Sequence, residues 1–203
     1  MYRFVRPNLL PLVLAAAVIV ASPMLGHAQS PTWKIDPAHS AANFTVRHLG
    51  ISNVHGHFGG VTGEIVLNPA DLTKSSVKAT VDTTTVDTGV PMRDTDLKSD
   101  HFFEVAKYPT MIFVSKSISK NGEGYSVTGD LTMHGVTKQV VLAMDSPSGE
   151  VAMGKQTRRG FDATTTIHRK DFGLTFGETL TKAGDAMIGD DVKVTLEVEA
   201  IEQ

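Results

Sequence analysis

The sequence predicts an all-β protein: one eight-stranded antiparallel barrel with a single short capping helix. Apolar and polar residues alternate with a period of two in segment after segment, which is typical of strands that bury one face. Turn signals such as Asn121-Gly122 separate these segments, and tight hairpins favour an antiparallel meander over parallel strands joined by helices. One segment, residues 91–98, breaks the alternation.

The first strands lie between residues 32 and 67. Residues 32–36 form a short strand that ends at Pro37, because proline has no N–H to donate to a ladder. The alternation resumes at residues 43–48. Glycines then crowd the chain, as a strand that coils sharply at a barrel corner requires. They stand at positions 50, 56, 59, 60 and 63.

Further strands follow along the rest of the chain. The alternating segments are residues 63–68, 77–82, 110–118, 125–133, 140–144, 161–167 and 192–200. The turn at His134-Gly135 sets the register of the two strands beside it. Odd positions before this turn and even positions after it face the same side. We therefore expect Leu131 and Leu142 to share the barrel interior.

Residues 91–98, with the sequence PMRDTDLK, are predicted to be the one helix. Pro91 suits the first helical position, where an N–H has no partner within the helix. Asp94 lies in the early turns, where negative charge is favourable. We expect Phe102 and Phe103, which follow the helix, to fill one end of the barrel.

The first 28 residues have the pattern of a secretory signal peptide. Arg3 and Arg6 precede an apolar run at residues 9–20, and Gly26-His27-Ala28 is a small-x-small cleavage site. The sequence thus predicts a signal peptide at residues 1–28 and one exported domain at residues 29–203. An uncleaved anchor is the alternative, although the run is short for a membrane span.

Composition restricts where the exported domain works and what it binds. It contains no cysteine, so its core must stabilise it without disulfides, and this favours a periplasm. Without Arg3 and Arg6 its net charge is −5. Since no basic cluster interrupts this acidic balance, we expect no binding to nucleic acid.

An eight-stranded barrel holds either a packed core or one small ligand. The exported domain has eleven aromatic residues and many small inward positions, so composition alone leaves both outcomes open. The inward set from the alternation supplies the candidate ligand-binding residues. They are Phe44, Val46, Ile65, Leu67, Val81, Phe113, Leu131, Met133, Leu142, Phe161, Ile167, Val194 and Leu196.

Signals for catalysis are weak. The chain has no cysteine and no Gly-x-Ser-x-Gly motif, so we predict no catalytic residue and no catalytic cofactor. His55 and His57 share one face of a strand, but a zinc or copper site needs a third and usually a fourth ligand. We therefore predict no metal. A metal-dependent hydrolase and a ligand-free interaction module remain alternatives.

Several charged side chains are candidates for the rim of the barrel. One interpretation is a set of surface ion pairs, each of small energetic value. The other is contact with the polar headgroup of a lipid, which an arginine can bind with two parallel hydrogen bonds. The candidate rim residues are Arg47, His48, Arg93, Asp94 and Arg169.

Four short motifs follow one another along the exported domain. They are Trp-x-Ile-Asp-Pro-x-His-Ser at 33–40, Phe-x-Val-Arg-His-Leu-Gly at 44–50, Gly-Asp-Leu-Thr-Met-His-Gly-Val-Thr-Lys at 129–138 and Gly-Asp-Asp-Val at 189–192. In this order and spacing they resemble the YceI-like family over essentially the whole domain.

The resemblance implies a lipocalin-like barrel in the periplasm and no settled enzymatic activity. It also implies a bound amphiphilic polyisoprenoid lipid, of the isoprenoid quinone or polyprenyl type. Transport, storage and stress-linked sequestration of this lipid stay open. Transient contact with a membrane or a membrane protein stays open too, as does a homodimer.

Overall fold

The structure is a computed structural model that describes Met1, residues 30–180, Lys182, Gly184 and residues 186–203. The predicted signal peptide and its cleavage site lie outside the described residues, apart from Met1. Within the described ranges, no helix has the length and apolar character needed to cross a membrane.

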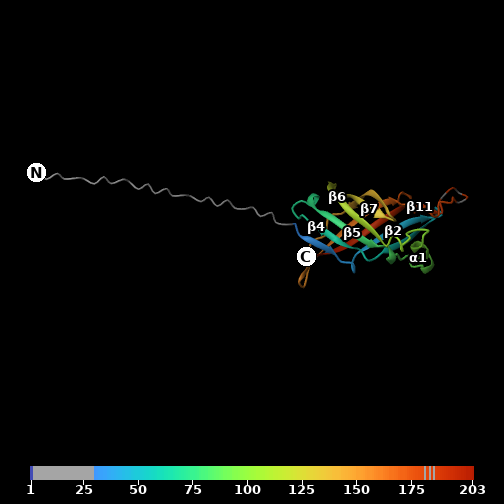
Figure 1. The fold of residues 1–203 in the computed structure, drawn as a ribbon, viewed down its shortest axis with the longest axis horizontal. Coiled ribbons are helices and arrows are strands. Elements are labelled where there is room, and N and C mark those ends of the chain that lie inside the picture. Colours follow the sequence, from blue (N-terminus) through green and yellow to red (C-terminus); the bar gives the residue numbers. More distant parts are fainter. Residues whose placement is uncertain (2–29, 181, 183, 185) are drawn as a thin grey trace.

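Eight antiparallel strands close into a barrel, as the sequence predicted (Figure 1). In ring order they are β1 (Thr32–Ile35), β4 (Thr62–Val66), β5 (Ser76–Asp82), β6 (Thr110–Asn121), β7 (Gly124–Met133), β8 (Val136–Met144), β10 (Gln156–His168) and β11 (Ile188–Glu202). The ring closes because β11 pairs with β10 along one edge and with β1 along the other.

Three more strands extend the sheet beyond this ring. β2 (Ala41–His48) and β3 (Ser52–Phe58) form a hairpin, and β2 pairs with residues 188–197 of β11. β1 pairs with residues 200–202 on the same edge of β11, so β1 and β2 follow each other along one strand. The break between them falls at Pro37, where the sequence predicted a strand end. β9 (Val151–Met153) pairs with the start of β10.

The helical segments are short. Among the described residues, the one α-helix is α1 (Pro91–Lys98), which has the predicted bounds. The same part of the chain contains three 3₁₀ turns: η1 (Leu72–Lys74), η2 (Thr83–Thr85) and η3 (Arg169–Phe172).

The predicted register across the His134-Gly135 turn is confirmed. Val127 faces Leu142, and Met133 faces Val136 at the turn itself. Both turn residues have positive φ, 51° for His134 and 75° for Gly135, as the tightest hairpin turns require. β8 begins four residues earlier than the alternating segment 140–144 indicated.

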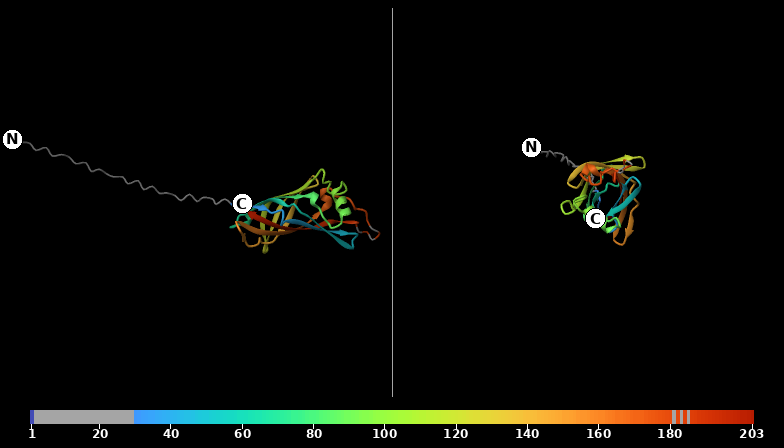
Figure 2. Two further views of the ribbon diagram at one scale, coloured as in Figure 1. Left: turned by 90° about the horizontal axis from the view of Figure 1, so that it is seen from below. Right: turned by 90° about the vertical axis from the view of Figure 1, so that its right-hand side faces the viewer.

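The two ends of the barrel differ. At one end lie α1, the β2–β3 turn at residues 49–51 and the described part of the loop at 173–187 (Figures 1 and 2). We call this the rim end. The start of β1 and the C-terminus lie at the opposite end, which we call the terminal end.

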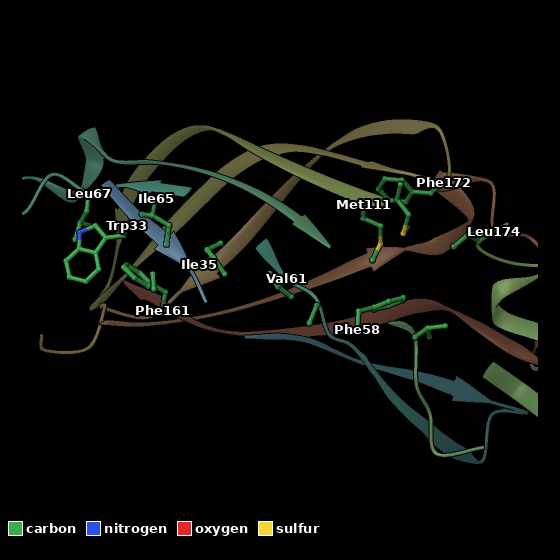
Figure 3. Packing of buried hydrophobic residues seen from close by; sticks show 14 residues of the cluster. Trp33, Ile35, Phe58, Val61, Ile65, Leu67, Met111, Phe161, Phe172 and Leu174 are labelled. Carbon is green, nitrogen blue, oxygen red and sulfur yellow. The ribbon is translucent and has the colours of Figure 1, made fainter. Parts of the chain in front are cut away.

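One cluster of buried side chains extends along the barrel (Figure 3). Trp33, Ile35, Ile65, Leu67 and Phe161 lie together toward the terminal end, and Trp33 is almost fully buried there. The same cluster continues toward the rim end with Phe58, Met111, Phe172 and Leu174.

A charged cluster holds the break between β1 and β2. One terminal nitrogen of Arg158 donates to Asp36 at 2.8 Å and also to Glu199 on β11. The Ser40 hydroxyl donates to the Glu199 carbonyl at 3.3 Å and accepts from the Glu199 N–H at 3.1 Å. Hydrogen bonds from His39, then from the Ala38 N–H and Arg158, hold the pKa of Asp36 at about 2. The kink is therefore tied to the strand that closes the ring.

This cluster predicts a specific acid sensitivity. Because the pKa of Asp36 is lowered on folding from 3.8 to about 2, its ionised form stabilises the fold fully above about pH 4, and this contribution disappears as pH falls through about 2. Wild type and Asp36→Asn should therefore differ in urea midpoint above about pH 4 and converge near pH 2. Glu64→Gln, at an exposed position of β4, is the control and should show no such convergence. A difference that stays constant with pH would contradict the assignment.

Candidate ligand-binding cavity

A cavity of about 440 Å³ runs inside the barrel from the terminal end to the rim end. Leu72, Ser75 and Pro147 line it at the terminal end, and Leu97 and Phe176 line it at the rim end. Its wall is apolar along most of this length.

All thirteen candidate ligand-binding residues line this cavity. Their side chains come from β2, β4, β5, β6, β7, β8, β10 and β11, with Leu67 directly after β4. Period-two alternation therefore located the inward face of each of these strands. That these residues bind a ligand stays a prediction.

The sequence reading missed part of the wall. Val54 and Phe58 alternate on β3, and the same period-two signal would have found them. Leu97 comes from α1, while Leu174 and Phe176 come from the loop after η3. These three carry no strand periodicity, so only the tertiary structure places them at the cavity.

Two glycines make room for aromatic rings in the wall. A Cβ at Gly56 would come closer than 3.0 Å to the ring of Phe44, and one at Gly129 would come equally close to the ring of Phe113. Each ring thus lies across the backbone of the neighbouring strand. Any larger residue at either glycine would push an aromatic ring further into the cavity.

Aromatic side chains gather in the cavity wall toward the rim end. The Phe58 ring lies 5.5 Å from that of Phe44 and 5.3 Å from that of Phe103. Phe102 is buried and packs 5.2 Å from Phe176. Phe102 and Phe103 therefore lie at one end of the barrel, in the place predicted for them.

The few charged residues that line the cavity also lie toward the rim end. Of the five candidate rim residues, Arg47, His48, Arg93 and Arg169 line it, whereas Asp94 does not. Arg47 donates to the Gly50 carbonyl at 3.1 Å and to Asn53 at 3.2 Å.

Arg93 and Asp94 share one partner on the segment before α1. Arg93 donates to the hydroxyl and the carbonyl of Thr88, at 2.8 and 3.0 Å. Asp94 accepts from the Thr88 N–H at 2.9 Å. Contact of any of the five candidates with a headgroup stays a prediction.

Arg169 holds the loop that covers the rim end. Its side chain is only 4% exposed and donates to four backbone carbonyls. The acceptors are Gly189 and Phe176 at 2.8 Å, Ile188 at 3.0 Å, and Leu174. Burial lowers the pKa of Arg169. One guanidinium therefore joins the start of the loop to its end.

The model of the YceI-like domain family matches residues 33–200. The chain belongs to the YceI-like family. Protein YceI of Salmonella arizonae is 34% identical over 201 residues, which cover 98% of this chain and 99% of the relative.

Solved structures of similar proteins agree with this assignment. The YceI protein of Campylobacter jejuni matches with a TM-score of 0.64 and 33% identity, covering 77% of this chain and 90% of that one. A polyisoprenoid binding domain from Saccharophagus degradans, implicated in plant cell wall breakdown, matches with a TM-score of 0.57. It is 17% identical and covers 86% of this chain and 99% of the domain, so this likeness concerns the fold alone.

The two histidines considered for metal binding lie on the outside of this YceI-like barrel. His55 and His57 are exposed on β3, and His55 is 3.0 Å from the Thr45 hydroxyl. In the described ranges, neither belongs to a group of three potential metal ligands. One group that does occur is Asp36, His39 and Glu199, whose two carboxylates form ion pairs with Arg158. The other is the largely exposed set of His168, Asp190 and Asp191.

Arg169 provides a test of how the rim end is held. Arg169→Met removes four hydrogen bonds and should lower the free energy of unfolding by at least about 2 kcal/mol, since hydrogen bonds to charged groups are strong. Hydrogen exchange should accelerate at residues 174–180 and 186–189. Arg169→Lys keeps the charge but cannot reach all four carbonyls, so it should recover only part of the loss.

The adjacent Lys170→Met is the matched control. Lys170 is partly exposed and forms a 3.6 Å ion pair with Glu178, so its loss should cost less than about 1 kcal/mol. An Arg169→Lys protein as stable as wild type would show that charge alone, without the fork of the guanidinium, holds the loop.

Proposed function

We propose that this protein binds and carries an amphiphilic polyisoprenoid lipid, of the isoprenoid quinone or polyprenyl type, inside its barrel. The observation that carries the proposal is the long apolar cavity with its charged groups gathered at one end. Its volume of about 440 Å³ lies within the range of about 300–1,000 Å³ common for ligand sites. Family membership and the similarity in fold to a polyisoprenoid binding domain support it.

The division of the cavity suits a molecule with one polar end. An isoprenoid chain in the apolar part would gain about 0.8 kcal/mol for each CH₂ removed from water, so a long chain binds without strong polar contacts. The polar headgroup would then lie near Arg47, Arg93 and Asp96 at the rim end. In this arrangement the chain supplies affinity, and the rim end supplies orientation.

The proposal places the protein in the periplasm after removal of residues 1–28. The signal-like pattern of that segment and the absence of cysteine support this location. No catalytic step is assigned to the barrel. Contact with a membrane or membrane protein would accompany loading and release of the lipid, and a homodimer is compatible with carriage.

The lipid that the protein retains is the most direct test. The protein, secreted to a native periplasm and purified without detergent, should contain close to one isoprenoid quinone or polyprenyl lipid per chain. Organic extraction followed by mass spectrometry would identify and count it. If repeated extractions contain only phospholipid fatty acids or no lipid, the carrier function is wrong and an interaction module takes its place.

A charge inside the cavity should abolish retention of this lipid. Leu131→Asp places a carboxylate in the apolar wall, where ionised groups are unfavourable, so we expect at least a tenfold loss of bound isoprenoid, about 1.4 kcal/mol or more. Val141→Asp, at a half-exposed position on the outer face of β8, is the control and should retain the lipid. Circular dichroism would verify that both variants fold. Unchanged retention in folded Leu131→Asp would exclude the cavity as the binding site.

A further inference from the structure

Exposed apolar side chains gather at the rim end although they come from separate segments. Met92 on α1 is 85% exposed, Ile51 in the β2–β3 turn is 77% exposed, and Leu180 is 65% exposed. Phe176 and Met187 are about half exposed. We call these five side chains the apolar rim. Side chains of this size are costly to leave in water, so several at one end of a small domain indicate an interaction surface.

Backbone and ring contacts join these segments. The Leu49 N–H donates to the Met187 carbonyl at 2.9 Å, which ties the β2–β3 turn to the loop before β11. The Met187 N–H donates to the Thr179 carbonyl at 3.0 Å. The Phe176 ring stacks on His101 with 4.7 Å between ring centres, which brings the loop to the segment after α1. Figure 1 and the left view of Figure 2 show α1, the β2–β3 turn and the described part of this loop at the same end of the barrel.

The apolar rim is continuous with the cavity. Phe176 lines the cavity and is also 45% exposed to solvent. Leu97 lines the cavity from α1, the helix that carries the exposed Met92. An apolar chain leaving the barrel at this end would therefore meet apolar side chains from the interior to the outer surface.

We propose that the apolar rim docks onto the surface of a lipid bilayer, and that the bound lipid enters and leaves the barrel there. This inference rests on the proposed function, because a lipid carrier must exchange its ligand with a membrane. Five exposed apolar side chains on three segments at one end of the barrel suit insertion at the boundary between headgroups and acyl chains.

The charges beside the apolar rim fit the phosphates of a bilayer. Arg47 and Arg93 line the cavity at this end, and neither forms an ion pair with any residue that the structure describes. The nearby carboxylates of Asp94 and Asp96 form hydrogen bonds with Thr88 and His101, and not with either arginine. The two arginines therefore present positive charge that a phospholipid headgroup can pair with.

The terminal end of the barrel offers a matched control for the apolar rim. Val151 and Met153 on β9 are 62% and 66% exposed, as apolar as the rim side chains. They lie on the strand that pairs with the start of β10, near the C-terminal residues of β11, and they do not line the cavity. If exposed apolar side chains bound vesicles regardless of their position, substitutions at Val151 and Met153 would weaken vesicle binding as much as substitutions in the apolar rim.

The test compares glutamate substitutions at both ends. Ile51→Glu, Met92→Glu and Leu180→Glu should each lower binding to phosphatidylethanolamine–phosphatidylglycerol vesicles by about tenfold in a flotation assay. Transfer of a pyrene-labelled polyprenol from these vesicles into the barrel should slow to the same extent. Val151→Glu and Met153→Glu should change neither quantity by more than about twofold. All five positions are exposed, so the variants should fold.

Failure of this inference is distinguishable from failure of the proposed function. If wild type retains an isoprenoid but the rim and β9 variants behave alike, docking at the rim is wrong while carriage stands. If no isoprenoid is retained, carriage is wrong, and the flotation assay still decides docking. The apolar rim could instead bind a second copy of this chain, which analytical ultracentrifugation would detect. If wild type is a dimer and the rim substitutions dissociate it, the surface belongs to a second copy and the membrane proposal is wrong.

Discussion

The pairing of β11 on both of its edges is the constraint on which the rest of the structure depends. β11 pairs with β10 through eleven consecutive residues, from Asp191 to Ile201, and with β2 and then β1 on the other edge. Because every buried N–H and C=O needs a partner, this one strand turns an open sheet into a closed wall. The cluster of Arg158, Asp36 and Glu199 reinforces it where the opposite edge passes from β2 to β1. An interior cavity follows from this closure.

Because β1 and β2 share one edge of β11, the β2–β3 hairpin leaves the ring, and another segment must complete the wall beside it. The chain before α1 does so. The N–H groups of His57 and Asp87 each donate to the other residue's carbonyl, at 2.9 and 3.0 Å, and Arg93, Leu97, Phe102 and Phe103 then line the cavity. At the rim end, side chains from a helix and loops therefore complete the wall beside those of β2 and β3. Such segments rearrange at lower cost than a paired strand, which suits the end at which we propose that the ligand enters and leaves.

The extent to which the sequence predicted this structure follows from the range of each interaction. Period-two alternation is local, so it located all thirteen candidate wall residues, and the Pro91 signal located α1. Pairing partners are distant in sequence, so nothing local indicated that β2 and β1 share β11. The sequence also did not indicate that Arg169 joins the start of the loop at 173–187 to its end, because its four acceptors are backbone carbonyls that carry no sequence signal. The close approach of Phe113 to Gly129 depends on the pairing of β6 with β7 for the same reason.

In the proposed carrier, the contrast between the two ends provides a way for a barrel with few polar groups in its cavity to distinguish ligands. Apolar contacts are non-directional, so the wall around Leu131 and Phe161 favours any chain of suitable length. Discrimination therefore has to come from the rim end. There, Arg169 is already occupied by four carbonyls, whereas Arg47 and Arg93 bond to only two groups each. Since an arginine has five N–H donors, these two keep donors for a headgroup. Their placement beside exposed apolar side chains would put selection of the proposed lipid at the end where we propose that it crosses into the bilayer.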